Sequence, residues 1–252
     1  MLAEDPDLAE AVPVRDRSAA VEDCIASAVN LPRGRWDGQR VDVTPDGIGL
    51  LVLRGLLVRR VGVEDGFGAE ILGQGDLLRP WQGEGAQSSL SRTTGWRILE
   101  PARVAVLDRN AAARLARYPE LTGRLVAKAL ERSRNLATAM AIARHTRVEL
   151  RLHMLFWHLA DRWGRVRTGG VLVPLRLTHS LLGDLVSARR PSVSTAFSQL
   201  ARQGLVERIS EGWLLHGDPP SELLEVQPIS VAAAGEQGTG SALGESKRCI
   251  EL

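Results

Sequence analysis

Cysteine is nearly absent from this chain of 252 residues, since Cys24 and Cys249 stand near opposite ends. Two distant thiols are too few for a disulfide framework, a four-thiolate metal site or an iron–sulfur cluster. No apolar run approaches the roughly 18 residues that a membrane span needs. The acidic first residues lack the basic-then-apolar order of a secretory signal. The sequence therefore predicts a cytoplasmic, metal-free protein without a membrane partner.

Lysine is as scarce as cysteine, with two lysines beside thirty arginines, and the net charge is only +2. The charge is unevenly placed, because residues 1–30 hold seven acids and two arginines, whereas residues 147–217 hold ten arginines and five acids. Such a change from net negative to net positive charge along the chain favours a polyanionic partner for its later part. The 44% apolar and 25% charged residues are typical of a folded domain and exclude wholesale disorder.

The first half of the chain has the sequence pattern of a β domain. Short apolar runs broken by glycine-rich turns extend from about residue 40 to residue 108, notably at 47–57, 58–63, 68–72 and 98–107. This pattern predicts an antiparallel roll or barrel, which we place within residues 21–117. Residues 1–20 are acidic without clear periodicity, so we expect a disordered leader that ends in a short helix around 21–29.

Two helix-rich stretches follow, at 109–117 and 119–146, rich in Ala, Leu, Arg and Glu. In the second, apolar or small residues recur in steps of three and four, like a coiled-coil seam. Periodicity alone leaves two alternatives open, a dimer seam or one helix packed on its own domain. The residues of the stripe are Val126, Ala129, Ser133, Leu136, Met140 and Ala143.

Residues 177–217 carry the strongest functional signal. Thr178 is a good N-cap for a two-turn helix over 179–187, and Pro191 opens a second helix that runs to about residue 203. Two short helices joined by a tight turn predict a helix-turn-helix. Apolar runs at 205–209 and 212–216 then predict a β-hairpin wing, while residues 218–252 have the composition of a disordered tail.

The outer face of the second helix is suited to B-form DNA. Arginine can donate two hydrogen bonds to guanine, and serine or threonine hydroxyls can bind phosphate or base edges. The alternative is a small helical subdomain with an ordinary polar face. The candidate DNA-binding residues are Arg189, Arg190, Ser192, Ser194, Thr195 and Gln199. His153 and His158 are five residues apart, which is not the spacing that directs two imidazoles at one metal.

The order of β domain, long helix, second helix, helix-turn-helix and wing resembles the Crp/Fnr transcription regulators, over roughly residues 21–217. The most specific match is LTHSLLGDLVSARRPSVSTAFSQLARQGLVER. Weaker similarity is found in LRGLLVRR, GQGDLL and ILEPARVAVLD. The resemblance implies an α+β fold, with a cyclic-nucleotide-binding-type β-roll, a long dimerisation helix over 118–146 and a winged helix-turn-helix over 147–217. It also implies a homodimer that binds double-stranded DNA, with RNA polymerase as a further partner.

The nucleotide-binding cassette of that family is degenerate here. Arg79 and Pro80 stand where a Gly-Glu pair would contact the ribose, although Arg92-Thr93 falls at the Arg-Ser/Thr position that contacts the cyclic phosphate. Gly83-Glu84 is an alternative pair if the alignment shifts. The resemblance therefore gives Arg92, Thr93 and Arg79 as candidate ligand-binding residues, and a solvated loop role for Arg92 stays open beside it.

The sequence thus predicts a sequence-specific DNA-binding regulator that reads a palindromic operator through residues 191–203. The alternative is a nucleotide or second-messenger receptor that binds DNA only when liganded. No cofactor is specified, and a small nucleotide-like effector at the β-roll is left open. We expect no enzyme, because the sequence has no nucleophile elbow, phosphate-loop lysine motif, metal-ligand set or dinucleotide fingerprint.

Overall fold

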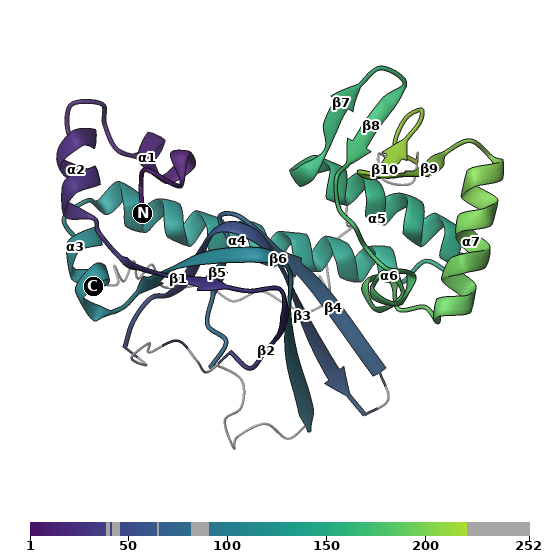
Figure 1. Ribbon diagram of the computed structural model, residues 1–252, viewed down its shortest axis with the longest axis horizontal. Coiled ribbons are helices and arrows are strands. Elements are labelled where there is room, and N and C mark those ends of the chain that lie inside the picture. The colour runs from purple at the N-terminus through teal and green to yellow at the C-terminus, as the bar shows by residue number, and fades with distance from the viewer. Residues whose placement is uncertain (39–40, 42–45, 65, 82–90, 221–252) are drawn as a thin grey trace, which may run out of the picture. The chain divides into compact units, whose positions relative to one another are not determined.

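The computed structural model describes residues 1–38, 41, 46–64, 66–81 and 91–220 (Figure 1). Its first part is an antiparallel β-roll in which β1, β6, β3 and β4 are hydrogen-bonded in that order, while β2 pairs with β6 and β5 with β3. The strands are β1 Ser27–Leu31, β2 Gly34–Trp36, β3 Gly49–Val63, β4 Gly66–Leu72, β5 Leu77–Leu78 and β6 Arg92–Leu107. The fold class predicted from the sequence, a mixed fold with an N-terminal cyclic-nucleotide-binding-type roll, is confirmed.

The long strands β3 and β6 form the centre of the roll. The runs at 47–57 and 58–63, which read as separate segments, form the single strand β3, because Gly55 lets the chain bend without stopping. Gly55 has a φ of +95°, and a Cβ on it would lie 2.5 Å from the Ala102 Cα of β6. Register shifts between β3 and β6 fall at this place, so the glycine marks a bulge that coils the sheet.

The expectation of a disordered leader over residues 1–20 is wrong. These residues form helix α1, Pro6–Ala11, and most of helix α2, Arg17–Asp23, and the chain enters β1 where the short helix was expected. Leu2, Leu8 and Val12 are almost completely buried in a core that they share with the roll. Sequence periodicity misses this segment because a six-residue helix is too short to repeat an apolar face.

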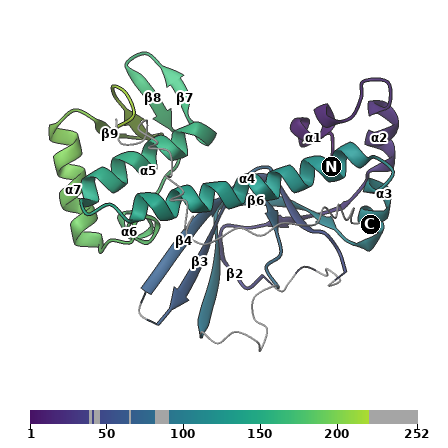
Figure 2. The same ribbon diagram turned by 180° about the vertical axis from the view of Figure 1, so that it is seen from behind.

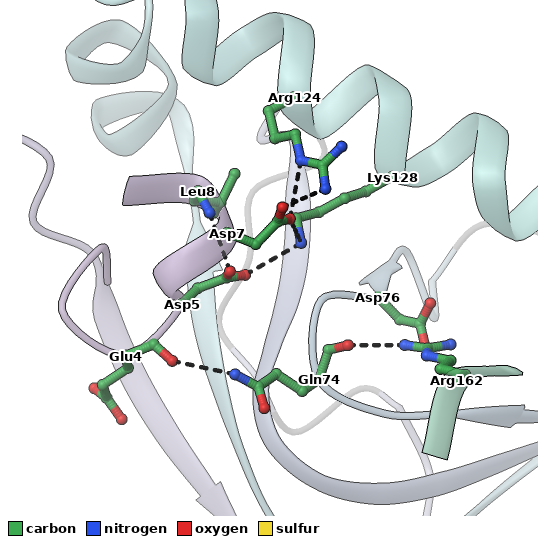
Figure 3. A network of polar contacts seen from close by, with 9 residues as sticks. All are labelled: Glu4, Asp5, Asp7, Leu8, Gln74, Asp76, Arg124, Lys128 and Arg162. Carbon is green, nitrogen blue, oxygen red and sulfur yellow. Dashed lines mark hydrogen bonds and ion pairs between the residues drawn. The ribbon is translucent and has the colours of Figure 1, made fainter. Parts of the chain in front are cut away.

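Two acids of this segment, Asp5 and Asp7, are partners of helix α4, Pro119–Ala143 (Figure 3). Asp5 caps α1 by accepting a hydrogen bond from the Leu8 N–H at 3.2 Å. The Lys128 Nζ lies 3.5 Å from Asp5 and 2.5 Å from Asp7, and Arg124 holds Asp7 through a second ion pair. Arg124 and Lys128 in the first half of α4 thus neutralise the charge of Asp5 and Asp7.

The first two helices after the roll match the helix-rich stretches predicted at 109–117 and 119–146. Helix α3 is Arg109–Leu115, α4 follows, and α5 is Val148–Trp163. Helix α4 contacts α1 near its start and α5 and α6 towards its end (Figure 2). Within the described residues, no helix has both the length and the apolar content to cross a membrane.

The last described part is the winged domain. Helices α6 His179–Val186 and α7 Arg190–Arg202 pack with α5, and α5 and α7 contact a sheet in the order β7-β8-β10-β9. Its strands are β7 Arg165–Arg167, β8 Gly170–Val173, β9 Val206–Ile209 and β10 Gly212–Leu215. The apolar runs at 205–209 and 212–216 form the hairpin of β9 and β10, and β7 and β8 complete the sheet. The expected tail lies outside the described residues after residue 220.

Candidate nucleic-acid interface

The turn between α6 and α7 has the geometry that a helix-turn-helix requires. The Thr178 hydroxyl caps α6 by accepting a hydrogen bond from the Leu181 N–H at 3.2 Å. Ser187 ends the helix in the left-handed region with a φ of 53°, and the Ala188 N–H reaches back to the Gly183 carbonyl at 2.9 Å. A Cβ on Gly183 would lie 2.5 Å from the Ala188 oxygen, so glycine permits the close turn.

Helix α7 begins with two exposed arginines and an N-terminus without a side-chain cap. Arg189 is the extended N-cap residue, Arg190 is the first helical residue, and Pro191 follows in the first turn. Free backbone N–H groups and the positive end of the helix dipole attract phosphate. The start of α7 therefore presents two guanidinium groups and the positive end of the helix dipole on one exposed surface.

The hydroxyl groups of α7 donate along the helix and keep their oxygens as acceptors. The Ser194, Thr195 and Ser198 hydroxyls donate to the carbonyl four residues earlier at 3.1–3.3 Å. Ser192 and Thr195 are exposed, while Ser194 and Gln199 are half-buried. The structure thus places all six candidate DNA-binding residues on or directly before α7.

An aromatic cluster holds this face in place. Phe197 on the inner side of α7 stacks on Trp213 of β10 with the ring centroids 4.5 Å apart. Phe156 of α5 contacts both rings, at 5.6 Å and 5.1 Å, and is fully buried. Helix α5 and strand β10 thus fix the orientation of α7 through one continuous aromatic core.

His179 links this core to the polar face. Its ring stacks on Phe197 at 5.1 Å, and its Nδ1 lies 2.9 Å from the Ser194 hydroxyl. Burial lowers the pKa of His179, and the positive charges of Arg208 and Arg190 lower it further. The folded protein therefore favours the neutral imidazole more strongly than the unfolded chain does.

This pKa predicts how the stability of the chain depends on pH. Because the unfolded chain takes up a proton on His179 at a higher pH than the folded chain, folding stability falls as the pH drops below about 6.5. Urea unfolding between about pH 7.5 and about pH 5.5 should show this loss, and His179→Gln should have a flatter profile. Identical slopes for the two proteins would contradict the assignment.

Further residues of this surface were missed by the sequence analysis. Two adjoining hollows run from the start of α6 to the wing and share Thr178 and Arg208 in their walls. One also contains Arg176, and the other reaches Ser180 and Arg190. The signal that could have found Arg176 and Arg208 is their position, one directly before α6 and one on the wing.

The arginines of this face lack acidic partners. In the winged domain, Arg147, Arg162 and Arg167 form ion pairs with carboxylates. The arginines that line the two hollows or begin α7 form no ion pair within the described part of the chain. Arg208 lies over the Trp213 ring at 5.6 Å. The arginines without an acidic partner on this face are Arg176, Arg189, Arg190 and Arg208. This distribution concentrates uncompensated positive charge along α7, the start of α6 and the wing.

The candidate ligand-binding residues do not form one site. Arg79 follows β5 near the Gly49 end of β3, where its guanidinium donates a hydrogen bond to the Gly47 carbonyl. Arg92 and Thr93 pair with Val63 and Gly62 at the other end of that strand and are exposed. The structure therefore separates Arg79 from Arg92 and Thr93, while Gly83 and Glu84 lie outside the described residues.

The candidate dimerisation stripe follows one side of α4. Val126 and Met140 are 54% and 71% exposed, and Leu130, which the sequence analysis left out, is 56% exposed. Ala129 and Ser133 are also exposed, whereas Leu136 and Ala143 are half-buried. An apolar helix face of this exposure is uncovered in the single chain. Across the described residues, no group of three or more His, Cys, Asp or Glu side chains is placed to hold a metal ion.

Comparison with known proteins supports this assignment of parts. The family model of the Crp-like helix-turn-helix domain matches residues 150–219. No curated protein sequence matched the chain.

Three solved structures illustrate the shared fold. A mutant of CooA from Carboxydothermus hydrogenoformans is 18% identical with a TM-score of 0.58, covering 82% of this chain and 89% of its own. The c-di-GMP responsive global regulator CLP of Xanthomonas campestris is 17% identical with a TM-score of 0.55, covering 80% and 100%. A cyclic nucleotide-binding domain containing protein from Listeria monocytogenes is 12% identical with a TM-score of 0.60, covering 79% and 91%. Residues 150–219 thus match a Crp-like helix-turn-helix domain, and the chain shares the fold of these three solved structures.

Proposed function

We propose that this protein is a homodimeric, sequence-specific DNA-binding transcription regulator that reads a palindromic operator through α7. The observation that carries the proposal is the row of arginines without acidic partners around the start of α7, on a helix that the aromatic core holds in place. Such a helix fits the major groove, with Arg189 and Arg190 reaching base edges or phosphates. Arg176 and Arg208 would bind the flanking phosphates.

The exposed face of α4 supports the homodimer. Val126, Leu130 and Met140 would be covered by the same face of a second copy, as in a two-stranded coiled coil. Such a dimer would present two copies of α7 to successive major grooves, about 34 Å apart. RNA polymerase is the protein partner that a transcription regulator bound at such a site would contact.

The double substitution Val126→Glu/Met140→Glu should convert the dimer into a monomer, because it places unpaired charges in an apolar seam. Sedimentation equilibrium at micromolar concentration measures the change. Val166→Glu is the matched control, since Val166 is 89% exposed on β7, away from α4. A double variant that still sediments as a dimer would place the interface elsewhere.

The β-roll supports a second candidate, a receptor whose DNA binding depends on a small effector. CLP, which shares this fold, is named as responsive to c-di-GMP. Arg92 and Thr93 at the start of β6 remain the candidate contacts for an effector within the roll. Calorimetry with cyclic nucleotides and dinucleotides tests this candidate without DNA.

Selection of random and genomic DNA fragments on the purified full chain tests the proposed function. We expect enrichment of an inverted repeat whose half-sites are one helical turn apart. Arg189→Ala/Arg190→Ala should lose the enrichment, while Arg147→Ala, which removes an arginine already paired with Glu149, should keep it. Failure to enrich any sequence, with and without metabolites from a cell extract, would overturn the proposal.

A further inference from the structure

The open hollow at the start of α6 contains a titratable group that the DNA contacts proposed above leave unused. Its lining combines His179, the first residue of α6, with Arg190 at the start of α7 and Arg208 of β9. Within the described residues, no acidic side chain lines this hollow or the adjoining one. The hollow therefore brings one imidazole together with two cations that the chain itself does not neutralise.

Hydrogen bonding assigns the proton of the neutral His179 ring to Nδ1. The Ser194 hydroxyl donates to the Arg190 carbonyl at 3.2 Å, so its oxygen accepts from the Nδ1–H group 2.9 Å away. The ring also stacks on Phe197, with 15° between the two planes, and lies 6.4 Å from the Trp213 ring. Nε2 is thus left as the nitrogen that can gain a proton, on a ring that three contacts hold in place.

The surroundings of His179 oppose this second proton in the absence of DNA. Burial lowers the pKa of His179, and the positive charges of Arg208 on β9 and Arg190 on α7 lower it further. A phosphate in the hollow would reverse this balance, because its negative charge offsets the two guanidinium groups and favours the imidazolium form. The uncharged groups in contact with the ring are Ser194, Phe197 and Trp213.

We propose that His179 contacts the DNA backbone and takes up a proton when a phosphate enters this hollow, so that DNA binds more tightly at lower pH; the proposal rests on the proposed function. The proton comes from the solvent and binds at Nε2, whose N–H then donates a charge-assisted hydrogen bond to a phosphate oxygen. Nδ1–H donates to Ser194 in both protonation states, so protonation adds charge without breaking the contact to α7. DNA binding thereby depends on pH in the range where imidazole titrates.

The affinity for the selected operator, measured by fluorescence anisotropy from about pH 8 to about pH 6 at constant salt, tests the proposal. We expect the affinity to rise as the pH falls, by up to about tenfold per pH unit for each His179 that gains a proton. The loss of folding stability expected at low pH would weaken binding, so it cannot produce this rise.

Two glutamine variants assign the pH dependence to one histidine. His179→Gln keeps a hydrogen-bond donor but cannot become charged, so its affinity should stay nearly constant with pH. His216→Gln is the matched control, because it removes a half-buried histidine of the same domain that lies directly after β10 and outside both hollows. It should keep the full rise. An unchanged rise in His179→Gln, or its loss in His216→Gln instead, would overturn the proposal.

Calorimetry of DNA binding near pH 6.5, in two buffers of different ionisation enthalpy, counts the protons directly and needs no variant. We expect net uptake of up to about one proton for each protomer. No net uptake would overturn the proposal. An operator affinity that does not change with pH in the natural chain would also overturn it, while leaving the proposed function intact.

NMR titration of the His179 ring, with pyrophosphate as the probe, tests the hollow without DNA. The midpoint of the titration should move to higher pH when pyrophosphate is added, and the His216 midpoint should not follow it. This movement in a chain that binds no DNA at any pH would support the phosphate site and overturn the proposed function. No movement together with no DNA binding would overturn both.

Discussion

Replacing Phe156 with alanine should destabilise the chain by about 3–5 kcal/mol, because the residue is fully buried and lies between two other aromatic rings. The cavity would remove the support that α5 gives to Phe197 and Trp213, so α7 would lose its fixed orientation. Specific DNA binding should therefore fall together with stability.

Urea unfolding of the full chain, followed by tryptophan fluorescence, measures the first effect of Phe156→Ala. Phe67→Ala is the matched control, because Phe67 is 49% exposed on β4 and its loss creates no cavity. We expect the control to stay within about 1 kcal/mol of the natural chain. An unchanged midpoint in Phe156→Ala would contradict the aromatic core described above.

Arg190→Ala should weaken binding to the selected operator by about 1–3 kcal/mol and relax the preference at one base pair of each half-site. The arginine is the first residue of α7, is exposed, and has no acidic partner within the described residues. A base contact would change selectivity, whereas a phosphate contact would weaken all sequences alike and reduce the salt dependence.

Titration of operator variants at several salt concentrations separates these two roles of Arg190. Arg147→Ala serves again as the control for the loss of one positive charge. Unchanged affinity and selectivity in Arg190→Ala would remove this residue from the interface. The same titration of Arg208→Ala should show a uniform loss across sequences, as expected for a wing residue that binds phosphate.

The winged domain could be predicted from sequence because its signals are local. Thr178 caps α6 with its side-chain hydroxyl, Pro191 suits the first turn of α7, and the apolar stripe of α7 repeats within thirteen residues. The bounds of α4, α6 and α7 therefore lie within a few residues of those expected.

The features missed by sequence depend on contacts between distant residues. The acids of α1 read as a solvated leader, and only the fold brings Asp5 and Asp7 to Lys128. Arg176 and Arg208 are far apart in sequence and share one hollow because the wing lies beside the segment that precedes α6. The separation of Arg79 from Arg92 likewise follows from the length of β3, which the sequence divided into two runs.

Hydroxyl-radical footprinting of the full chain on its selected DNA tests the central claim most directly. If two copies of α7 enter successive major grooves, the backbone should be protected in two windows on one face of the duplex, one helical turn apart. Arg189→Ala/Arg190→Ala should lose both windows at the same protein concentration. A single window, or protection that does not depend on these two arginines, would contradict a dimeric regulator that reads DNA through α7.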